Sequence, residues 1–251
     1  MIHSFLMIGQ SNMAGRGFKE EVEPIKNPRI KVLRNGRWQK MYVPVNPDRP
    51  FSGISLAESF ADAYAKEHDV DVGLIPCADG GTSLDQWCVD GLLFSNTVSQ
   101  AELAGRTSTI AGILWHQGET DCQEHLYGQY EEKCTHILQT LRERLGLWDV
   151  PVLVGGLGDY LSLRTEDPYL GKNYRSVNQA LMAMAQKQER YGYVSAEGLT
   201  SNPDYLHFDA KSLREFGLRY YQEFKKLEDP NKVFPEKPEA DAAIKSAIEL
   251  L

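Results

Sequence analysis

A serine near the start of the chain and an Asp–His pair near its end stand in settings that suit nucleophilic chemistry. Ser11 follows an apolar, strand-like run, residues 3–8, within the stretch MIGQSNMAGRG. His207 lies in the late stretch NPDYLHFD, three residues after Asp204. A serine nucleophile needs a base to take its proton and a third group to orient that base. The D-x-x-H spacing lets a short turn aim the Asp204 carboxylate at one imidazole nitrogen and leave the other for Ser11.

Such chemistry also needs N–H donors for the negative oxygen that forms when a carbonyl is attacked. Gly80 and Gly81 lie in the stretch PCADGGTSLDQW, and Gln117 lies in HQGETD. The candidate donors are the backbone N–H of Ser11, the N–H of either glycine and the side-chain amide of Gln117. The sequence leaves open which glycine donates.

Each candidate also has an ordinary structural explanation. A serine after a strand usually caps the next segment, and a tryptophan is most often a core residue. The conjunction favours chemistry, because every candidate lies in a loop expected to open at the carboxyl end of one sheet. Three more residues in these loops are candidate substrate contacts, namely Gln10 beside Ser11, Trp87 as a stacking platform for a sugar, and Glu119.

The elements that must position these loops indicate an α/β fold. Apolar runs with little polar alternation predict buried parallel strands over residues 3–8, 72–75, 110–115, 152–154 and 193–195. Helical patterns separate several of them, over residues 56–68, 127–145, 174–191 and 210–227. Ser55 and Glu58 fit a capping box at the start of the first helix. The alternation predicts a parallel sheet covered by helices on both faces.

Two segments fall outside this alternation. Residues 29–42 carry Asn35-Gly36 between two strand-like runs, which predicts a β-hairpin, and we interpret about residues 29–48 as an insert. Residues 228–238 are rich in proline and charge, and a short helix is expected over 240–251. We therefore expect one main domain over residues 1–229, followed by a connector and terminal helix over 230–251.

The composition narrows the class of protein. The chain has 251 residues, 42% of them hydrophobic and 25% charged, with a formal net charge of −8. This is typical of a soluble globular protein, and the acidic balance argues against nucleic-acid and anionic-membrane partners. The N-terminus lacks a basic region and a cleavage site, so we expect a cytoplasmic protein. None of the four cysteines forms a C-x-x-C pair, so we expect free thiols and no zinc site.

Taken together, GQSNMAG, IPCADGGTSLDQW, WHQGETD and DYLHF resemble the SGNH hydrolase superfamily. More narrowly, they resemble the branch that holds carbohydrate esterase family 6 acetylxylan esterases and sialate O-acetylesterase-like proteins. The resemblance implies a three-layer α/β/α sandwich with flavodoxin-like strand order, in which the first and third strands are neighbours. Gln10 stands where many members carry Asp, and Gln117 and Glu119 replace a Gly-x-Asn-Asp block. Both departures are typical of the carbohydrate-esterase branch.

The same resemblance implies roles for the site residues. Ser11 would be the nucleophile, His207 the base and Asp204 its orienter. The implied oxyanion donors are Ser11, one glycine of the Gly-Gly pair and the amide of Gln117. The implied activity is a serine esterase that removes small O-acyl groups, chiefly acetyl, from carbohydrates such as acetylated xylan or sialic acid. It would proceed through an acetyl-enzyme and need no metal or organic cofactor.

Three alternatives stay open at the level of the sequence. The first is an esterase of the same mechanism that acts on lipid or on another acyl chain. The second is a metal-assisted or two-carboxylate hydrolase that uses Glu119 and Asp121 with His116 or His125. The third is a catalytically silent sugar-binding protein, against which the intact Ser, His and Asp candidates argue. The sequence does not identify the oligomeric state.

Overall fold

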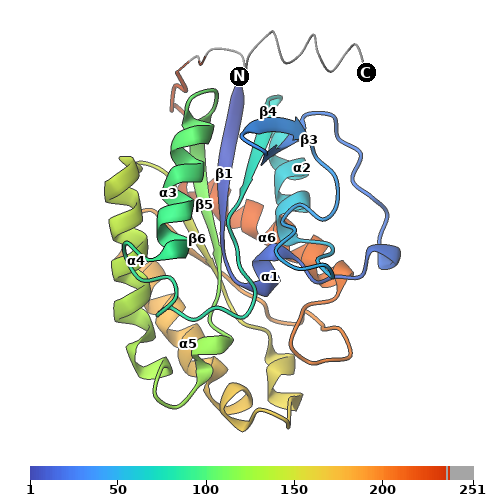
Figure 1. Cartoon of the computed structure of the whole chain (residues 1–251), viewed down its shortest axis with the longest axis vertical. Coiled ribbons are helices and arrows are strands. Elements are labelled where there is room, and N and C mark those ends of the chain that lie inside the picture. The colour runs from blue at the N-terminus through green and yellow to red at the C-terminus, as the bar shows by residue number, and fades with distance from the viewer. Residues whose placement is uncertain (236, 238–251) are drawn as a thin grey trace.

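A seven-stranded sheet forms the centre of the computed structural model, which describes residues 1–235 and 237 (Figure 1). Its order is β3-β2-β4-β1-β5-β6-β7, and every neighbouring pair is parallel except β2 with β3. Apolar runs form the central strands because both of their faces are buried. The strands are β1 Ile2–Gly9, β2 Ile30–Arg34, β3 Arg37–Lys40, β4 Asp71–Pro76, β5 Thr109–His116, β6 Val152–Gly155 and β7 Tyr191–Val194.

Helices cover both faces of this sheet, as predicted. Helices α2 and α6 pack against each other on one face, and α3, α4 and α5 cover the other (Figure 1). β1 lies between β4 and β5, which confirms the flavodoxin-like order and the neighbouring first and third predicted strands. The α-helices of the described part are α1 Ser11–Ala14, α2 Leu56–His68, α3 Leu92–Gly105, α4 Tyr130–Leu145, α5 Pro168–Lys187 and α6 Ala210–Leu227.

An aromatic cluster fixes α2 and α6 on the sheet. The ring of Phe5 in β1 lies 4.8 Å from the rings of both Phe60 and Tyr64 in α2. Phe224 of α6 contacts the same three rings, and all four side chains are buried. Burying one such ring contributes roughly 1.5–3 kcal/mol. This packing matters for the site because the loop that carries His207 leads directly into α6.

Most helix predictions hold, with differences that have local causes. The capping box of Ser55 and Glu58 is formed, and α6 has the predicted bounds. Helix α5 begins earlier than predicted, at Pro168, because Asp167 caps it and proline suits the first helical position. Helix α3 is absent from the prediction. Its sequence is rich in Ser, Thr and Asn, which are poor helix formers, and no side chain caps it.

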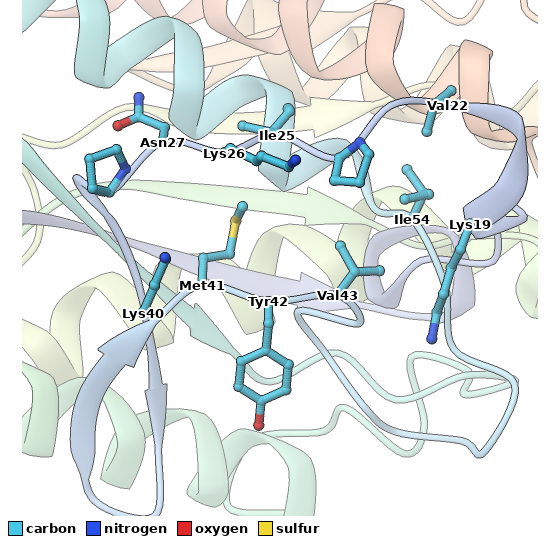
Figure 2. Close-up of a pocket in the computed structure, with 12 residues that line it drawn as sticks. Lys19, Val22, Ile25, Lys26, Asn27, Lys40, Met41, Tyr42, Val43 and Ile54 are labelled. Carbon is cyan, nitrogen blue, oxygen red and sulfur yellow. The ribbon is translucent and has the colours of Figure 1, made fainter. Parts of the chain in front are cut away.

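The predicted hairpin forms, and it belongs to the central sheet. Asn35 and Gly36 join β2 to β3 with φ angles of 51° and 74°, as a type I′ turn requires. β2 also pairs in parallel with β4, so the hairpin extends the sheet. It encloses a cavity of about 450 Å³ with the preceding segment, lined by apolar side chains such as Ile25 and Met41 and by three lysines (Figure 2).

Of the connector expected over residues 228–238, the structure describes residues 228–235 and 237. Phe234 of the connector stacks on His3 at 3.8 Å between ring centroids. The helix expected over 240–251 lies outside the described residues. All four cysteines are free, three of them buried. Among the described helices, none combines the length and the apolar character needed to cross a bilayer.

Gly9 is the point where the ends of β1 and β5 come closest. Its φ is 126°, and a Cβ placed on it would lie 2.0 Å from the carbonyl oxygen of His116. Only glycine combines this backbone conformation with this approach. The loops that follow β1 and β5 therefore begin in contact.

We expect Gly9→Ala to lower the free energy of unfolding by roughly 3 kcal/mol or more, because it adds a steric clash to backbone strain. Gly146 is the matched control, since it ends α4 with a φ of 64° but has open space around it. Gly146→Ala should cost only the strain, about 1–2 kcal/mol. Urea unfolding of both variants measures the difference. Equal losses would contradict the close approach at Gly9.

Candidate active site

Ser11 is the first residue of α1, the turn that follows β1 at the carboxyl end of the sheet, opposite the N-terminus in Figure 1. Gln10 caps this turn, and its carbonyl oxygen accepts hydrogen bonds from the N–H groups of Met13 and Ala14. The N–H of Ser11 makes no hydrogen bond within residues 1–235. The turn thus presents both the hydroxyl and the free N–H of Ser11 at the end of the strand.

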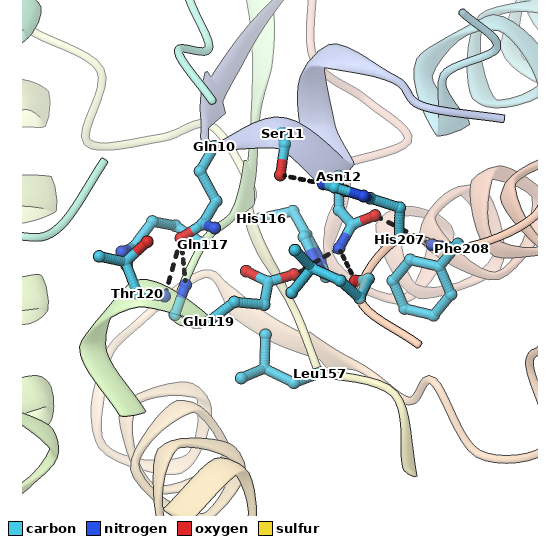
Figure 3. Close-up of polar contacts among 12 residues, drawn as sticks. Gln10, Ser11, Asn12, His116, Gln117, Glu119, Thr120, Leu157, His207 and Phe208 are labelled. Atoms are coloured by element: carbon cyan, nitrogen blue, oxygen red, sulfur yellow. Dashed lines mark hydrogen bonds and ion pairs between the residues drawn. The ribbon is translucent and has the colours of Figure 1, made fainter. Parts of the chain in front are cut away.

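His207 and Asp204 meet Ser11 in a continuous hydrogen-bonded chain, of which Figure 3 shows the contact between Ser11 and His207. His207 Nε2 lies 3.0 Å from Ser11 Oγ, and its Nδ1 lies 2.6 Å from Asp204 Oδ2. The other Asp204 oxygen accepts from the N–H groups of Leu206 and His207 at 2.9 and 3.0 Å. The D-x-x-H turn therefore has the geometry expected from its spacing. In this arrangement a serine can pass its proton to an imidazole whose far nitrogen is held by a carboxylate.

The hydrogen bonds to Asp204 set its charge. Burial acts to raise the pKa of this carboxyl, but the hydrogen bonds from the His207 ring and from two N–H groups outweigh it and lower the pKa to about 2. The group is consequently ionised at any pH near neutrality. An ionised partner favours one imidazole tautomer, with its proton on Nδ1 and its lone pair toward Ser11.

Ser11 and His207 line an open cavity of about 410 Å³. Its surroundings include three arginine side chains although the chain as a whole is acidic. The cavity beside the hairpin (Figure 2) is lined by no serine, histidine or carboxylate among the described residues, so it is not a candidate for this chemistry. The other residues that line the Ser11 cavity include Gln10, Arg16, Arg49, Phe51, Gly80, Gly81, Glu119 and Arg164.

Charged side chains hold the Gly-Gly loop against Ser11. Asp48 Oδ2 accepts from Arg16 at 2.7 Å and from the Gly80 N–H at 2.9 Å. Arg49 donates to the Gly80 carbonyl oxygen at 2.9 Å. Burial acts to raise the pKa of Asp48, but hydrogen bonds from Arg16 and Ser52 and the Arg16 charge outweigh it, so the pKa is lowered. The sequence analysis missed these residues, although Arg16 lies in the first motif itself.

These contacts distinguish the two glycines. A Cβ on Gly80 would lie 2.4 Å from an Arg16 nitrogen and 3.3 Å from the Ser11 Cβ, so this position lies next to the serine and requires glycine. The Gly80 N–H is nevertheless committed to Asp48. The Gly81 N–H makes no hydrogen bond within residues 1–235, and it is the one available to a ligand.

Gln117 does not lie where the sequence analysis placed its amide. The side chain is fully buried, and its amide donates to the Thr82 carbonyl oxygen at 3.0 Å and to the Asp121 carboxylate. Both amide hydrogens are thus used inside the protein, and Gln117 is not among the described residues that line the Ser11 cavity. The prediction that it donates to an oxyanion is wrong for this geometry.

Gln10 presents an amide to the cavity instead. Its Oε1 accepts from the N–H groups of Gly118 at 3.3 Å and Thr120 at 3.5 Å (Figure 3). Because these contacts fix the amide oxygen, the amide nitrogen Nε2 is the free donor of this side chain, and it makes no hydrogen bond within the described residues. Gln10, predicted as a substrate contact, thus lines the cavity, and N–H groups of the β5 loop hold its side chain there.

The prediction for Trp87 as a stacking platform is wrong. Its side chain is only 1% exposed, its indole N–H donates to the Thr82 hydroxyl at 3.0 Å, and its ring packs against Trp115 at 5.4 Å. Trp87 is a core residue. An exposed aromatic ring does line the cavity, that of Phe51, which is 70% exposed.

Glu119 borders the cavity, but its carboxylate binds protein groups. Oε1 accepts from Asn12 Nδ2 at 2.5 Å and lies 3.3 Å from His116 Nε2 (Figure 3). Burial acts to raise the pKa of Glu119, but the hydrogen bonds and charge of His116 and the hydrogen bond from Asn12 outweigh it and lower the pKa. The Asp121 carboxylate accepts hydrogen bonds from the Leu84 N–H and from the Gln117 amide. Within the described residues no three His, Cys, Asp or Glu side chains are arranged to hold a metal ion.

Comparison with known proteins places this site in a family. A family profile described as carbohydrate esterase, sialic acid-specific acetylesterase, matches residues 1–226. The chain belongs to this family. It is therefore a carbohydrate esterase, and the match covers both Ser11 and the Asp204–His207 turn.

Individual relatives agree with the assignment of this esterase. A probable carbohydrate esterase of Arabidopsis thaliana is 27% identical over 243 residues, which cover 88% of this chain and 89% of the relative. A solved Arabidopsis thaliana structure matches with a TM-score of 0.80 and 26% identity, over 89% of this chain and 98% of the other. The structure of NanS matches in fold, with a TM-score of 0.67 at 16% identity, over 90% and 97% of the two chains.

The raised pKa of Asp121 predicts a pH effect on stability. Burial raises this pKa from 3.8 to about 6, so between these values the folded protein binds more protons than the unfolded chain. The free energy of unfolding should therefore fall as pH rises through this window. Asp121→Asn keeps an oxygen for Gln117 and Leu84 but cannot ionise, so it should be less sensitive to pH there. Urea unfolding at pH 4, 5, 6 and 7 measures the slope.

The exposed Asp90 provides the control for this experiment. Asp90→Asn should leave the pH dependence of unfolding as in the wild type, because exposed ion pairs contribute little to stability. A wild-type slope in Asp121→Asn would show that Asp121 is not the titrating group.

Proposed function

We propose that this esterase hydrolyses O-acetyl esters on carbohydrates, with Ser11 as nucleophile, His207 as general base and Asp204 as its orienter. One observation carries the proposal, namely the hydrogen-bonded chain from Asp204 through His207 to Ser11 at the carboxyl end of the sheet. The family to which the chain belongs supports the substrate class.

The acylation step follows from this geometry. Ser11 Oγ attacks the acetyl carbonyl carbon while its proton passes to His207 Nε2, 3.0 Å away. The tetrahedral intermediate collapses, and the sugar oxygen leaves with that proton. Water then attacks the acetyl-enzyme and gives a proton to His207, which passes it to Ser11 Oγ as the bond between Oγ and the acetyl carbon breaks and acetate leaves. Asp204, with a pKa of about 2, stays ionised throughout and stabilises the imidazolium.

Three N–H donors are available for the oxyanion. They are the backbone N–H groups of Ser11 and Gly81 and the Nε2 amide of Gln10, none of which is hydrogen-bonded within the described residues. Fixed donors of this kind stabilise the tetrahedral intermediate without reorganising during the reaction. The amide of Gln10 takes the place that the sequence analysis gave to Gln117.

The lining of the cavity favours a hydroxylated substrate over a lipid. Three arginines, two glutamines and two carboxylates line it, and its apolar side chains, Phe51, Leu170 and Leu206, are separate contacts among them. A long acyl chain needs a continuous apolar pocket, whereas a sugar is bound by polar groups with one aromatic or aliphatic contact. An acetylated acidic or neutral sugar fits this lining, and acyl chains as long as octanoyl do not.

We expect Ser11→Ala to reduce acetate release by about 10⁴- to 10⁶-fold, since a triad without its nucleophile retains little activity. Acetate release is measured with O-acetyl sialic acid, acetylated xylo-oligosaccharides and p-nitrophenyl acetate. The exposed Ser95 provides the control, and Ser95→Ala should retain wild-type rates. Residual activity of Ser11→Ala within about tenfold of wild type would refute the mechanism. Equal rates on octanoyl and acetyl esters would favour a lipid substrate.

The assignment of Gln10 over Gln117 is tested with a matched pair of variants. Gln10→Met removes the amide from the cavity and should lower kcat by roughly 10²–10³ with little change in KM. Gln117→Met removes two buried hydrogen bonds and should lower Tm, with a smaller loss of kcat than Gln10→Met. Steady-state kinetics and thermal unfolding of both variants decide the question. A reversed pattern would restore Gln117 as the donor.

A further inference from the structure

Asn12 lies beside the nucleophile in sequence, has no part in the mechanism above, and contacts the loop of His207. We propose that Asn12 is a positioning residue that holds the His207 ring against Ser11, and that Glu119 orients Asn12 for this task. The inference rests on the proposed function of His207 as the base. It also gives a role to Glu119, which the sequence analysis took for a substrate contact.

The side-chain amide of Asn12 binds the backbone on both sides of His207. Its Oδ1 accepts from the Phe208 N–H at 3.1 Å, and its Nδ2 donates to the Leu206 carbonyl oxygen at 3.2 Å (Figure 3). The Asn12 side chain is fully buried. One amide thus spans the three residues 206–208, with His207 in the middle.

We call these two hydrogen bonds the Asn12 clip, and they link the loop of His207 to the turn that carries Ser11. Ser11 and Asn12 are consecutive residues of α1, so a clip from Asn12 to residues 206 and 208 fixes the His207 backbone relative to Ser11. Other contacts hold the same loop: the Asn202 N–H donates to the His207 carbonyl oxygen at 2.8 Å, and Asn202 Nδ2 donates to the Arg16 carbonyl oxygen at 2.9 Å. Arg164 donates to the Asp204 carbonyl oxygen at 2.6 Å, and none of these bonds joins both residue 206 and residue 208. A shift of about 1 Å between reacting groups can cost roughly 10²-fold in rate.

Glu119 determines which end of the Asn12 amide faces each neighbour. An ionised carboxylate only accepts hydrogen bonds, so its Oε1, 2.5 Å away, requires the Asn12 nitrogen on its side. The same nitrogen then reaches the Leu206 carbonyl oxygen, which leaves Oδ1 for the Phe208 N–H. A flipped amide would oppose its nitrogen to an N–H group. His116 Nε2 lies 3.3 Å from the same oxygen and is a second hydrogen-bond partner of the buried carboxylate.

The proposal predicts how catalysis and stability separate in variants. Asn12→Ala should lower kcat for p-nitrophenyl acetate by about 10- to 100-fold and leave KM within about threefold, because Asn12 does not line the cavity. The control is Asn178→Ala, which removes an amide that binds the N–H and carbonyl of Leu157 at 2.7 and 2.9 Å. This control should lower Tm to a similar extent but keep kcat within about threefold.

A double-mutant cycle identifies the route of the effect. In a His207→Ala background, Asn12→Ala should change the residual rate by less than about threefold, because a positioning residue has nothing left to position. An equal loss with and without His207, or an unchanged kcat in the single variant, would overturn the proposal. Activity that survives Ser11→Ala would instead overturn the proposed function, so the two failures are distinguishable.

An isosteric pair covers the case in which Asn12→Ala does not fold. Asn12→Asp sets two carboxylates against each other and should lose at least about tenfold of kcat. Adding Glu119→Gln restores a donor opposite an acceptor, and the double variant should regain at least about fivefold over Asn12→Asp alone. No recovery in the double variant would overturn the role assigned to Glu119.

Discussion

The close approach of β1 and β5 at Gly9 is the constraint on which the rest of the site depends. Because the two strands stay paired to their last residues, the Gln10 N–H reaches the His116 carbonyl oxygen at 2.9 Å. The loops after them then exchange side-chain contacts, Gln10 with the β5 loop and Asn12 with Glu119. The topological switch point of an open α/β sheet is where such loops diverge and leave room for a ligand. Here the loops begin in contact at Gly9, and the cavity of about 410 Å³ that Ser11 and His207 line lies beyond that contact.

Three carboxylates around this point are all buried to some degree, yet their partners give them different charges. Asp204 accepts several hydrogen bonds and has a pKa of about 2, which suits a permanently ionised orienter. Asp121 accepts from neutral amides, and burial prevails and raises its pKa to about 6. At Glu119, burial also acts to raise the pKa, but the hydrogen bonds from His116 and Asn12 outweigh it and lower the pKa. Burial opposes ionisation at all three sites, most at Glu119 and Asp121, and the number and charge of the donors decide whether it prevails.

The sequence was sufficient for what local signals encode and insufficient for side-chain direction. Apolar runs, the capping box and the D-x-x-H turn depend on neighbouring residues, and the structure contains them. Position after a strand also placed Ser11 and His207 at the correct edge of the sheet. The same rule failed for Gln117 and Trp87, because it assigns a residue to a loop without saying whether its side chain faces the cavity or the core. Gln117 binds Thr82 of the β4 loop, and Trp87 packs on Trp115 of β5, so their neighbours come from other segments of the chain.

The pairing of Arg16 with Asp48 lay beyond sequence reasoning for another reason, since it joins segments whose proximity only the fold creates. The chain after the hairpin, which the sequence suggests is an unexplained insert, runs beside the Gly-Gly loop and holds it at three points. Asn46 binds the N–H and carbonyl of Ala78, both at 3.0 Å, and Asp48 binds the Gly80 N–H.

Arg49 completes this support from the same segment, at the Gly80 carbonyl oxygen. Each of these bonds occupies a donor or acceptor of the loop, whereas the Gly81 N–H, at the lining of the cavity, makes no hydrogen bond within residues 1–235. The hairpin extends the sheet through β4, and β4 leads into the Gly-Gly loop. The hairpin is therefore connected through β4 to the loop that carries the proposed oxyanion donor, Gly81. Asn46, Asp48 and Arg49, which take no part in the proposed reaction, thus occupy neighbouring groups of this loop and leave the Gly81 N–H without a partner in the described residues.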